Sequence, residues 1–142
     1  MYSGQCLCGD IQFEIDGELD PIQVCYCKQC QRAQGTALAT NIPVAAASIR
    51  LLKGGDSIRS YESSPGKHRC FCGRCGSPIY SKRDSLPDVI RIRAGLIDGE
   101  LSSRPVAHFH VASKPNWWAI TDELPQFAAA YIKTQTTGSS PK

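Results

Sequence analysis

The sequence predicts a mainly β protein, a small and largely antiparallel domain with little helix. Short segments of strand-forming residues recur along the chain, and segments rich in glycine, proline and serine separate them. The chain has 142 residues, which is enough for one hydrophobic core and short for two. We therefore predict one domain over residues 1–133 and a flexible, polar tail over residues 134–142.

The composition is that of a globular protein, with 42% hydrophobic and 20% charged residues. The net charge of +3 comes without dense runs of lysine or arginine, so we expect no nucleic-acid partner. No apolar run approaches the ~20 residues of a membrane helix, and the first residues lack the pattern of a signal peptide. We therefore expect a cytoplasmic protein with no membrane partner, and its oligomeric state stays open.

The first part of the chain predicts a hairpin, a strand and a short helix. Residues 2–15 form the hairpin, because apolar and polar side chains alternate in its second half, and residues 16–18 are a turn. Residues 21–27 are predicted to be extended. Residues 27–34 then form one or two helical turns, which Gly35 ends.

The rest of the chain predicts further strands and one weak helix. The strand segments are residues 36–42, 49–53, 57–61, 67–72, 78–82, 89–94 and 106–111. Residues 122–133 have a weak helical pattern, which Pro125 interrupts. His108 and His110 lie two positions apart in the last strand, so we expect both side chains on one side of it.

Three clusters contain all eight cysteines. They are Cys6-Leu7-Cys8-Gly9, Cys25-Tyr26-Cys27-Lys28-Gln29-Cys30 and Cys70-Phe71-Cys72-Gly73-Arg74-Cys75-Gly76. Cys-x-Cys on a strand places both thiols on one face, and Cys-x-x-Cys around a tight turn brings two sulfurs together. A tetrahedral zinc ion about 2.3 Å from each sulfur holds its ligands roughly 3.8 Å apart, which suits both spacings. In a reducing compartment the clusters favour metal binding over disulfides.

The thiols divide into two predicted zinc sites. Cys72 and Cys75 need two more ligands, which the first hairpin supplies if it lies beside strand 67–72. The ligands of this closed, structural site are Cys6, Cys8, Cys72 and Cys75. Three ligands with an open position are the arrangement of a catalytic zinc, and here they are Cys25, Cys27 and Cys30. Cys70 either completes the second site or is a small buried hydrophobic residue, and we favour the buried position.

The motifs resemble those of the glutathione-dependent formaldehyde-activating (GFA-like) family. The three cysteine clusters carry the resemblance, with the C-terminal segments His108-Phe109-His110-Val111-Ala112-Ser113-Lys114-Pro115, Trp117-Trp118 and Asp122-Glu123-Leu124-Pro125. The resemblance covers residues 3–127 and implies a β-rich fold of the Mss4-like type with two zinc ions per chain. It implies the same structural and catalytic cysteines. The chain differs from many family members at Tyr26, where they have histidine.

The resemblance also implies a reaction. It is that of a carbon–sulfur lyase of the S-hydroxymethylglutathione synthase type, in which glutathione or a similar thiol adds to formaldehyde or another small aldehyde. An open zinc position fits this chemistry, because zinc deprotonates a bound thiol whose ordinary pKa is about 8.5. Three thiolates give the site a net negative charge, which favours a thiolate nucleophile over polarisation of a carbonyl.

Two other classes of protein stay open. A non-catalytic binding module of the Mss4-like fold would hold two structural zinc ions, with Cys70 closing the second site. A redox enzyme would use Cys70 or Cys30 as its reactive thiol.

Several other residues are candidates for the site. His108 is a candidate base, and a structural histidine is the alternative. Cations that suit the carboxylates of glutathione are Lys28, Arg32, Arg91, Arg93 and Lys114, of which Arg91 and Arg93 are more simply a polar strand face. We predict structural roles for four other residues. Trp117 and Trp118 would cap the core. Asp122 and Glu123 would lie in a solvated turn or at a helix start.

Overall fold

The computed structural model describes residues 1–130. They form two compact units, one of Met1–Pro21 with Asn41–Ser103, the other of Ile22–Thr40 with the chain from Arg104 onward. Ten strands and one α-helix make the described residues mainly β, as predicted. The end of the predicted domain at residue 133 and the predicted tail at 134–142 lie outside the described residues, so these boundaries stay predictions.

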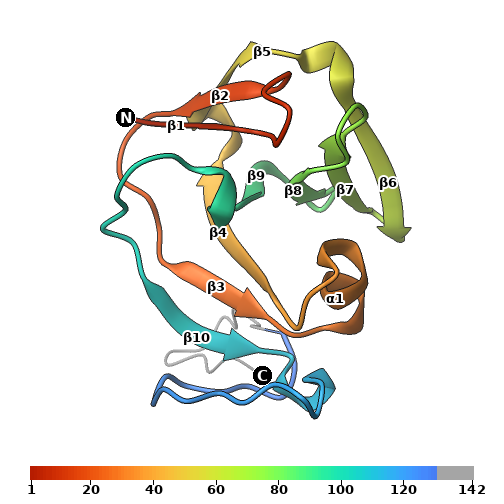
Figure 1. The fold of residues 1–142 in the computed structure, drawn as a ribbon, viewed down its shortest axis with the longest axis vertical. Helices are drawn as coiled ribbons and strands as arrows, with labels where there is room; N and C mark the ends of the chain where they lie inside the picture. Colours follow the sequence, from red (N-terminus) through yellow and green to blue (C-terminus); the bar gives the residue numbers. More distant parts are fainter. Residues whose placement is uncertain (131–142) are drawn as a thin grey trace. The chain divides into compact units, whose positions relative to one another are not determined.

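The first unit is built on two antiparallel strand arrangements (Figure 1). One has the order β1-β2-β5, with β1 at Tyr2–Gln5, β2 at Gln12–Ile15 and β5 at Ile49–Lys53. The other has the order β4-β9-β8-β7-β6; its strands are β4 (Ala39–Ala45, in this unit from Asn41), β6 (Ile58–Ser64), β7 (Lys67–Cys72), β8 (Pro78–Arg83) and β9 (Leu86–Arg93). Short 3-10 turns are η1 (Ala46–Ser48), η2 (Gly55–Ser57) and η3 (Ala94–Leu96).

The first hairpin forms as predicted and supplies part of the core. Tyr2 pairs with Ile15 and Gln5 with Gln12, which sets the register of β1 against β2. Phe13 and Ile15 are buried with 2% and 0% exposure, while Gln12 and Glu14 are partly exposed. Burying such a side chain contributes about 1.5–3 kcal/mol, so the alternation fixes the register of the hairpin.

The second unit contains β3 (Ile22–Cys25), α1 (Lys28–Gln34) and β10 (Pro105–Phe109), followed by η4 (Val111–Ser113). Figure 1 shows β3 and β10 side by side, and they pair in parallel with Phe109 opposite Cys25. A parallel pair needs a long connection, which the intervening chain provides here. Helix α1 ends as predicted at Gly35, whose left-handed backbone (φ 68°) lets its N–H donate to Gln31 O at 2.7 Å.

The helix predicted over residues 122–133 is wrong for residues 122–130, which contain no helix. The Asp122 carboxylate accepts the backbone N–H of Leu124 at 2.9 Å, and Pro125 follows directly. The backbone then bonds to β10 instead: His108 N donates to Pro125 O at 2.9 Å, and Phe127 N donates to His108 O at 2.8 Å. Pairing with the strand therefore satisfies the backbone groups that a helix would use. Residues 131–133 lie outside the described part of the chain.

Two predicted side-chain orientations also differ from the structure. His110 does not continue the alternation of His108, because β10 ends at Phe109 and His110 has a left-handed backbone (φ 58°).

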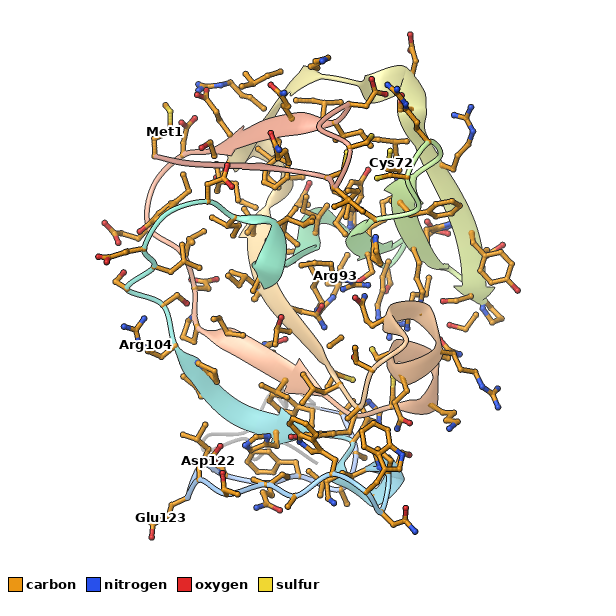
Figure 2. The ribbon with its side chains drawn as sticks, in the orientation of Figure 1. Met1, Cys72, Arg93, Arg104, Asp122 and Glu123 are labelled. Atoms are coloured by element: carbon orange, nitrogen blue, oxygen red, sulfur yellow. The ribbon has the colours of Figure 1, made fainter. Side chains whose placement is uncertain are left out.

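Arg93, labelled in Figure 2, does not lie on a solvated polar face, since it is only 6% exposed. Its guanidinium donates to Asn41 Oδ1 on β4 and, at 3.5 Å, to Ser81 Oγ on β8. The two neighbouring strands thus provide polar partners that a single-strand pattern cannot show.

Gly54 lies where two segments of the first unit approach each other closely. Its φ is +87°, and a Cβ added there would meet the carbonyl oxygen of Asp10 and lie 2.8 Å from the Asp10 carbonyl carbon. Gly17 has a similar φ of +82° but open space around its Cα. We expect Gly17→Ala to cost about 1 kcal/mol of unfolding free energy and Gly54→Ala about 2–4 kcal/mol, measured by denaturant titration. Equal costs would show that the close approach to Asp10 relaxes easily.

Candidate metal centres

Four cysteines of the first unit meet at one point. The Sγ atoms of Cys6, Cys8, Cys72 and Cys75 all lie within 4.8 Å of one another. Cys6 and Cys8 follow β1, Cys72 ends β7 (Figure 2), and Cys75 lies in the turn before β8. The Sγ separations of 3.6 Å for Cys6–Cys8 and 3.9 Å for Cys8–Cys72 match the roughly 3.8 Å edge of a tetrahedral zinc–sulfur site. This donor set therefore fits zinc.

Two similar turns hold these thiols in place. Gly9 N donates to Cys6 O at 3.1 Å, and Gly76 N donates to Cys72 O at 2.8 Å, both glycines having positive φ. Backbone N–H groups also point at the sulfurs, from Ile11 to Cys6 Sγ at 3.3 Å and from Arg74 to Cys72 Sγ at 3.4 Å. Such N–H groups stabilise thiolates, which are the form that binds metal.

Ser77 joins the two turns. Its Oγ accepts the backbone N–H of Leu7 at 2.9 Å and lies 3.2 Å from Cys75 Sγ. Hydrogen bonds from the Ser77 side chain and backbone lower the pKa of Cys75 to about 5. For Cys8, a hydrogen bond from the Asp10 backbone lowers the pKa, but burial and the neighbouring thiols outweigh it and raise the pKa to about 11. The pKa shifts of Cys75 and Cys8 thus run in opposite directions within one cluster. A divalent cation would offset the mutual repulsion of four thiolates.

Three cysteines of the second unit form another group. The Sγ atoms of Cys25, Cys27 and Cys30 lie within 4.8 Å of one another. Cys25 ends β3, and Cys27 caps α1, where its sulfur accepts the N–H of Cys30 at 3.3 Å. Hydrogen bonding to Cys27 and Cys30, together with burial, raises the pKa of the Cys25 thiol. This group suits a thiophilic cation. Among the described residues, its three cysteines are the His, Cys, Asp or Glu ligands that it offers.

The segment beyond the described residues adds no such ligand. Residues 131–142 contain no cysteine, histidine, aspartate or glutamate. The sulfurs thus lie in one group of four and one group of three, and zinc binding by each group stays a prediction.

His108 lies in a buried hydrogen-bonded chain. Its Nε2 is 3.0 and 3.1 Å from the two carboxylate oxygens of Asp122, and its Nδ1 is 2.9 Å from the Tyr26 hydroxyl. The Leu124 N–H and His108 both lower the pKa of Asp122, so the carboxylate accepts and Nε2 donates. In a neutral imidazole Nδ1 then accepts, so the Tyr26 hydroxyl donates to it. Trp118 also hydrogen-bonds to the Tyr26 side chain, and an indole can only donate.

Tyr26 and Asp122 are functional candidates that the sequence pattern did not identify as partners of His108. Tyr26 is 82 residues from His108, and no local spacing links the two. The alternation in β3 is the available signal: buried Ile22 and Val24 are in phase with buried Tyr26, while Cys25 and Cys27 are less buried. Asp122 is exposed and forms a turn, as predicted, but it also binds His108.

Cys70 is separate from both cysteine groups of the described residues. It is 3% exposed on β7, as favoured, and lies near Tyr80, whose pKa burial and the neighbouring Cys70 raise to about 12. Reactive thiols are partly exposed, whereas Cys70 and Cys30 are 3% and 2% exposed. The burial of both thiols disfavours the redox alternative. None of the eight cysteines forms a disulfide.

The other predicted candidates differ in exposure and in contacts. Lys28 and Arg32 are exposed on α1, and the Lys114 ammonium donates to carbonyl oxygens of Pro115 and Trp118. Trp117 and Trp118 are 68% and 42% exposed, so neither caps the core as predicted. A third potential cluster, which the sequence did not suggest, places an exposed Glu62 and Asp84 around His68, with His68 Nε2 3.1 Å from Asp84 Oδ1.

Among the described residues, no helix has the length and apolar character to cross a lipid bilayer. The solved structure of a protein from Rhodobacter sphaeroides matches 73% of this chain and 99% of its own, with a TM-score of 0.60 at 20% identity. This likeness supports the fold.

Two sequence comparisons identify relatives. A protein of Halomonas elongata with the provisional name glutathione-dependent formaldehyde-activating enzyme is 29% identical over 126 residues, covering 82% of this chain and 79% of the relative. The family model described as glutathione-dependent formaldehyde-activating enzyme matches residues 1–113, a stretch that contains all eight cysteines and His108. The chain therefore belongs to the glutathione-dependent formaldehyde-activating enzyme family.

Proposed function

We propose that the protein is a zinc-dependent carbon–sulfur lyase that adds a thiol, glutathione or a similar one, to formaldehyde or another small aldehyde and catalyses the reverse. The observation that carries the proposal is the difference between the two cysteine groups. A closed group of four sulfurs suits a structural ion, and a group of three leaves room for a substrate ligand. Membership of the glutathione-dependent formaldehyde-activating enzyme family suggests the two substrates.

In this proposal each group holds one zinc ion, with different roles. Cys6, Cys8, Cys72 and Cys75 hold the structural ion, and Cys25, Cys27 and Cys30 hold the catalytic one. The catalytic ion supplies a Lewis acid that lowers the pKa of a substrate thiol. We also propose a cytoplasmic location, because eight cysteines without a disulfide are typical of proteins in a reducing compartment.

The proposed reaction is an addition and needs no redox cofactor. The thiol sulfur forms a bond to the aldehyde carbon, the carbonyl π bond breaks, and the thiol proton ends on the former carbonyl oxygen. His108, proposed as the base, would act through the Tyr26 hydroxyl, because both of its ring nitrogens are engaged. Lys28 and Arg32 are exposed on the helix that carries Cys30, so they are the proposed contacts for the carboxylates of glutathione.

The metal content of the protein tests the two proposed zinc sites. Protein prepared reduced and with excess zinc is expected to contain about two zinc ions per chain, because each cysteine group supplies enough thiolates for one. Elemental analysis after gel filtration measures this. One ion per chain would contradict the catalytic site, and none would contradict both sites.

The activity itself is tested by exchange rates at equilibrium. The zinc-loaded protein should accelerate interconversion of glutathione, formaldehyde and their adduct above the spontaneous rate, as measured by NMR exchange spectroscopy. Cys30→Ser should lose this acceleration, and Cys70→Ser should keep it, because Cys70 lies outside both metal groups. A zinc-loaded wild-type protein that leaves the exchange rate unchanged with glutathione and with simple alkyl thiols would overturn the proposed function.

A further inference from the structure

The hydrogen bonds from Asp122 through His108 to Tyr26 form a chain that leads from the surface into the buried interior. Its inner members are nearly inaccessible, with Tyr26 1% and His108 5% exposed, while Asp122 at its outer end is exposed. A buried hydroxyl and a buried imidazole that satisfy one another are rigid, because breaking either bond leaves an unpaired polar atom.

Tyr26 is held through every polar atom it has. Its N–H donates to Phe109 O at 3.0 Å, its carbonyl accepts Gln31 Nε2 at 2.7 Å, and its hydroxyl bonds to His108 at 2.9 Å. Gln31 is itself buried and also donates to Ser113 O at 2.8 Å. These contacts fix Tyr26 to β10, to α1 and to the segment that follows β10.

The position of Tyr26 in the chain makes this anchoring relevant to the metal group. Tyr26 lies between Cys25 and Cys27, and in an extended chain alternate side chains point to opposite sides. The buried side of β3 holds Ile22 and Val24 in phase with Tyr26, so the two cysteines point away from the anchor. A rotation of the Tyr26 backbone would therefore move both flanking thiols at once.

We propose that Tyr26, His108 and Asp122 are positioning residues that preset the Cys25 and Cys27 thiols and thereby slow metal release from the three-cysteine group. The inference rests on the proposed function only in that this group holds a metal. Outer partners of metal ligands commonly change metal affinity by about 10–100-fold, and here the partners act through the backbone that the two ligands share. The exposed segment around Asp122 would thus influence the metal site without contacting the metal.

The test compares rates of metal release in the full-length, zinc-loaded protein. Zinc transfer to a chromophoric chelator is followed for wild type, Tyr26→Phe and Asp122→Ala, and Cys30→Ser identifies the phase that belongs to the three-cysteine group. We expect Tyr26→Phe and Asp122→Ala each to accelerate that phase by about 10-fold or more and to leave the four-cysteine phase unchanged. Asp122→Asn, which keeps an oxygen that accepts from Nε2, should retain most of the slow release.

A matched control and a double variant separate positioning from general loosening. Asp84→Ala removes a similar histidine–aspartate contact, that of the exposed Asp84 with His68, and should change neither phase. Tyr26→Phe combined with Asp122→Ala should be little faster than either alone, because both break one chain. With cobalt in place of zinc, the ligand-field bands of the three-cysteine group should shift in Tyr26→Phe but not in Asp84→Ala.

The outcomes distinguish this inference from the proposed function. If wild-type protein binds two ions, and Tyr26→Phe and Asp122→Ala release them at the wild-type rates, the positioning role alone is overturned. Equal acceleration of both phases would also overturn it, since that result indicates global destabilisation. Wild-type protein with one ion per chain would overturn the proposed catalytic site and the positioning role together.

Discussion

Cys72→Ser is expected to leave the protein largely unfolded. Cys72 is 0% exposed, and its sulfur lies within 4.8 Å of three other thiols. A structural zinc supplies about 10–16 kcal/mol of apparent binding free energy at neutral pH, comparable with the roughly 5–15 kcal/mol net stability of a whole domain. Loss of one ligand therefore removes a large part of the stability. Near-UV circular dichroism and zinc content, measured on the same sample, report the result.

Cys70→Ser is the matched control for this variant. Cys70 lies on the same strand and is similarly buried at 3%, but it belongs to neither cysteine group. Its replacement should cost only about 1–3 kcal/mol, the penalty of a poorly satisfied buried hydroxyl, and should leave the metal content unchanged. If the two variants lose structure to the same extent, burial and not metal ligation explains the role of Cys72.

The second large effect concerns the three-cysteine group. Cobalt bound there should acquire a fourth sulfur ligand when glutathione or a simple alkyl thiol is titrated in, because three cysteines leave one position for an external ligand. The thiolate-to-cobalt charge-transfer absorption of the three-cysteine group should then increase. This absorption is identified as the part of the spectrum that is missing in Cys30→Ser. A response to both thiols would indicate that the metal alone attracts them, whereas a response to glutathione alone would indicate recognition of its carboxylates.

The same titration distinguishes an enzyme from a binding module. Cys30→Ser should stay folded with one ion, because backbone pairing with β10 holds β3 in place. It should lose catalysis by more than the 10–100-fold typical of an outer partner. A cobalt spectrum with four sulfurs in both sites, indifferent to added thiol, would instead support the non-catalytic module. Cys30→Ser that unfolds as fully as Cys72→Ser would support it as well.

Local sequence patterns determined the class of fold, most of its strands and the division of the cysteines. The segments 49–53 and 67–72 were predicted with the bounds that β5 and β7 have, because turns on both sides delimit them. The thiols of each group were predictable because short spacings such as Cys72-x-x-Cys75 bring two sulfurs together within one turn. Gly35 ended α1 as expected, since the left-handed backbone that it needs is a local property.

The tertiary structure decided what depends on partners distant in the sequence. β10 pairs in parallel with β3, and this pairing brings His108 within 2.9 Å of Tyr26 across 82 residues. Residues 122–130 extend along β10 because backbone bonds to His108 replace those of a helix. Arg93 is buried because Asn41 and Ser81, from the two adjacent strands, accept its hydrogen bonds. Short spacings in the sequence determined which thiols come together as candidate metal ligands, whereas the environment that orients them depends on non-local hydrogen bonds that no single segment encodes.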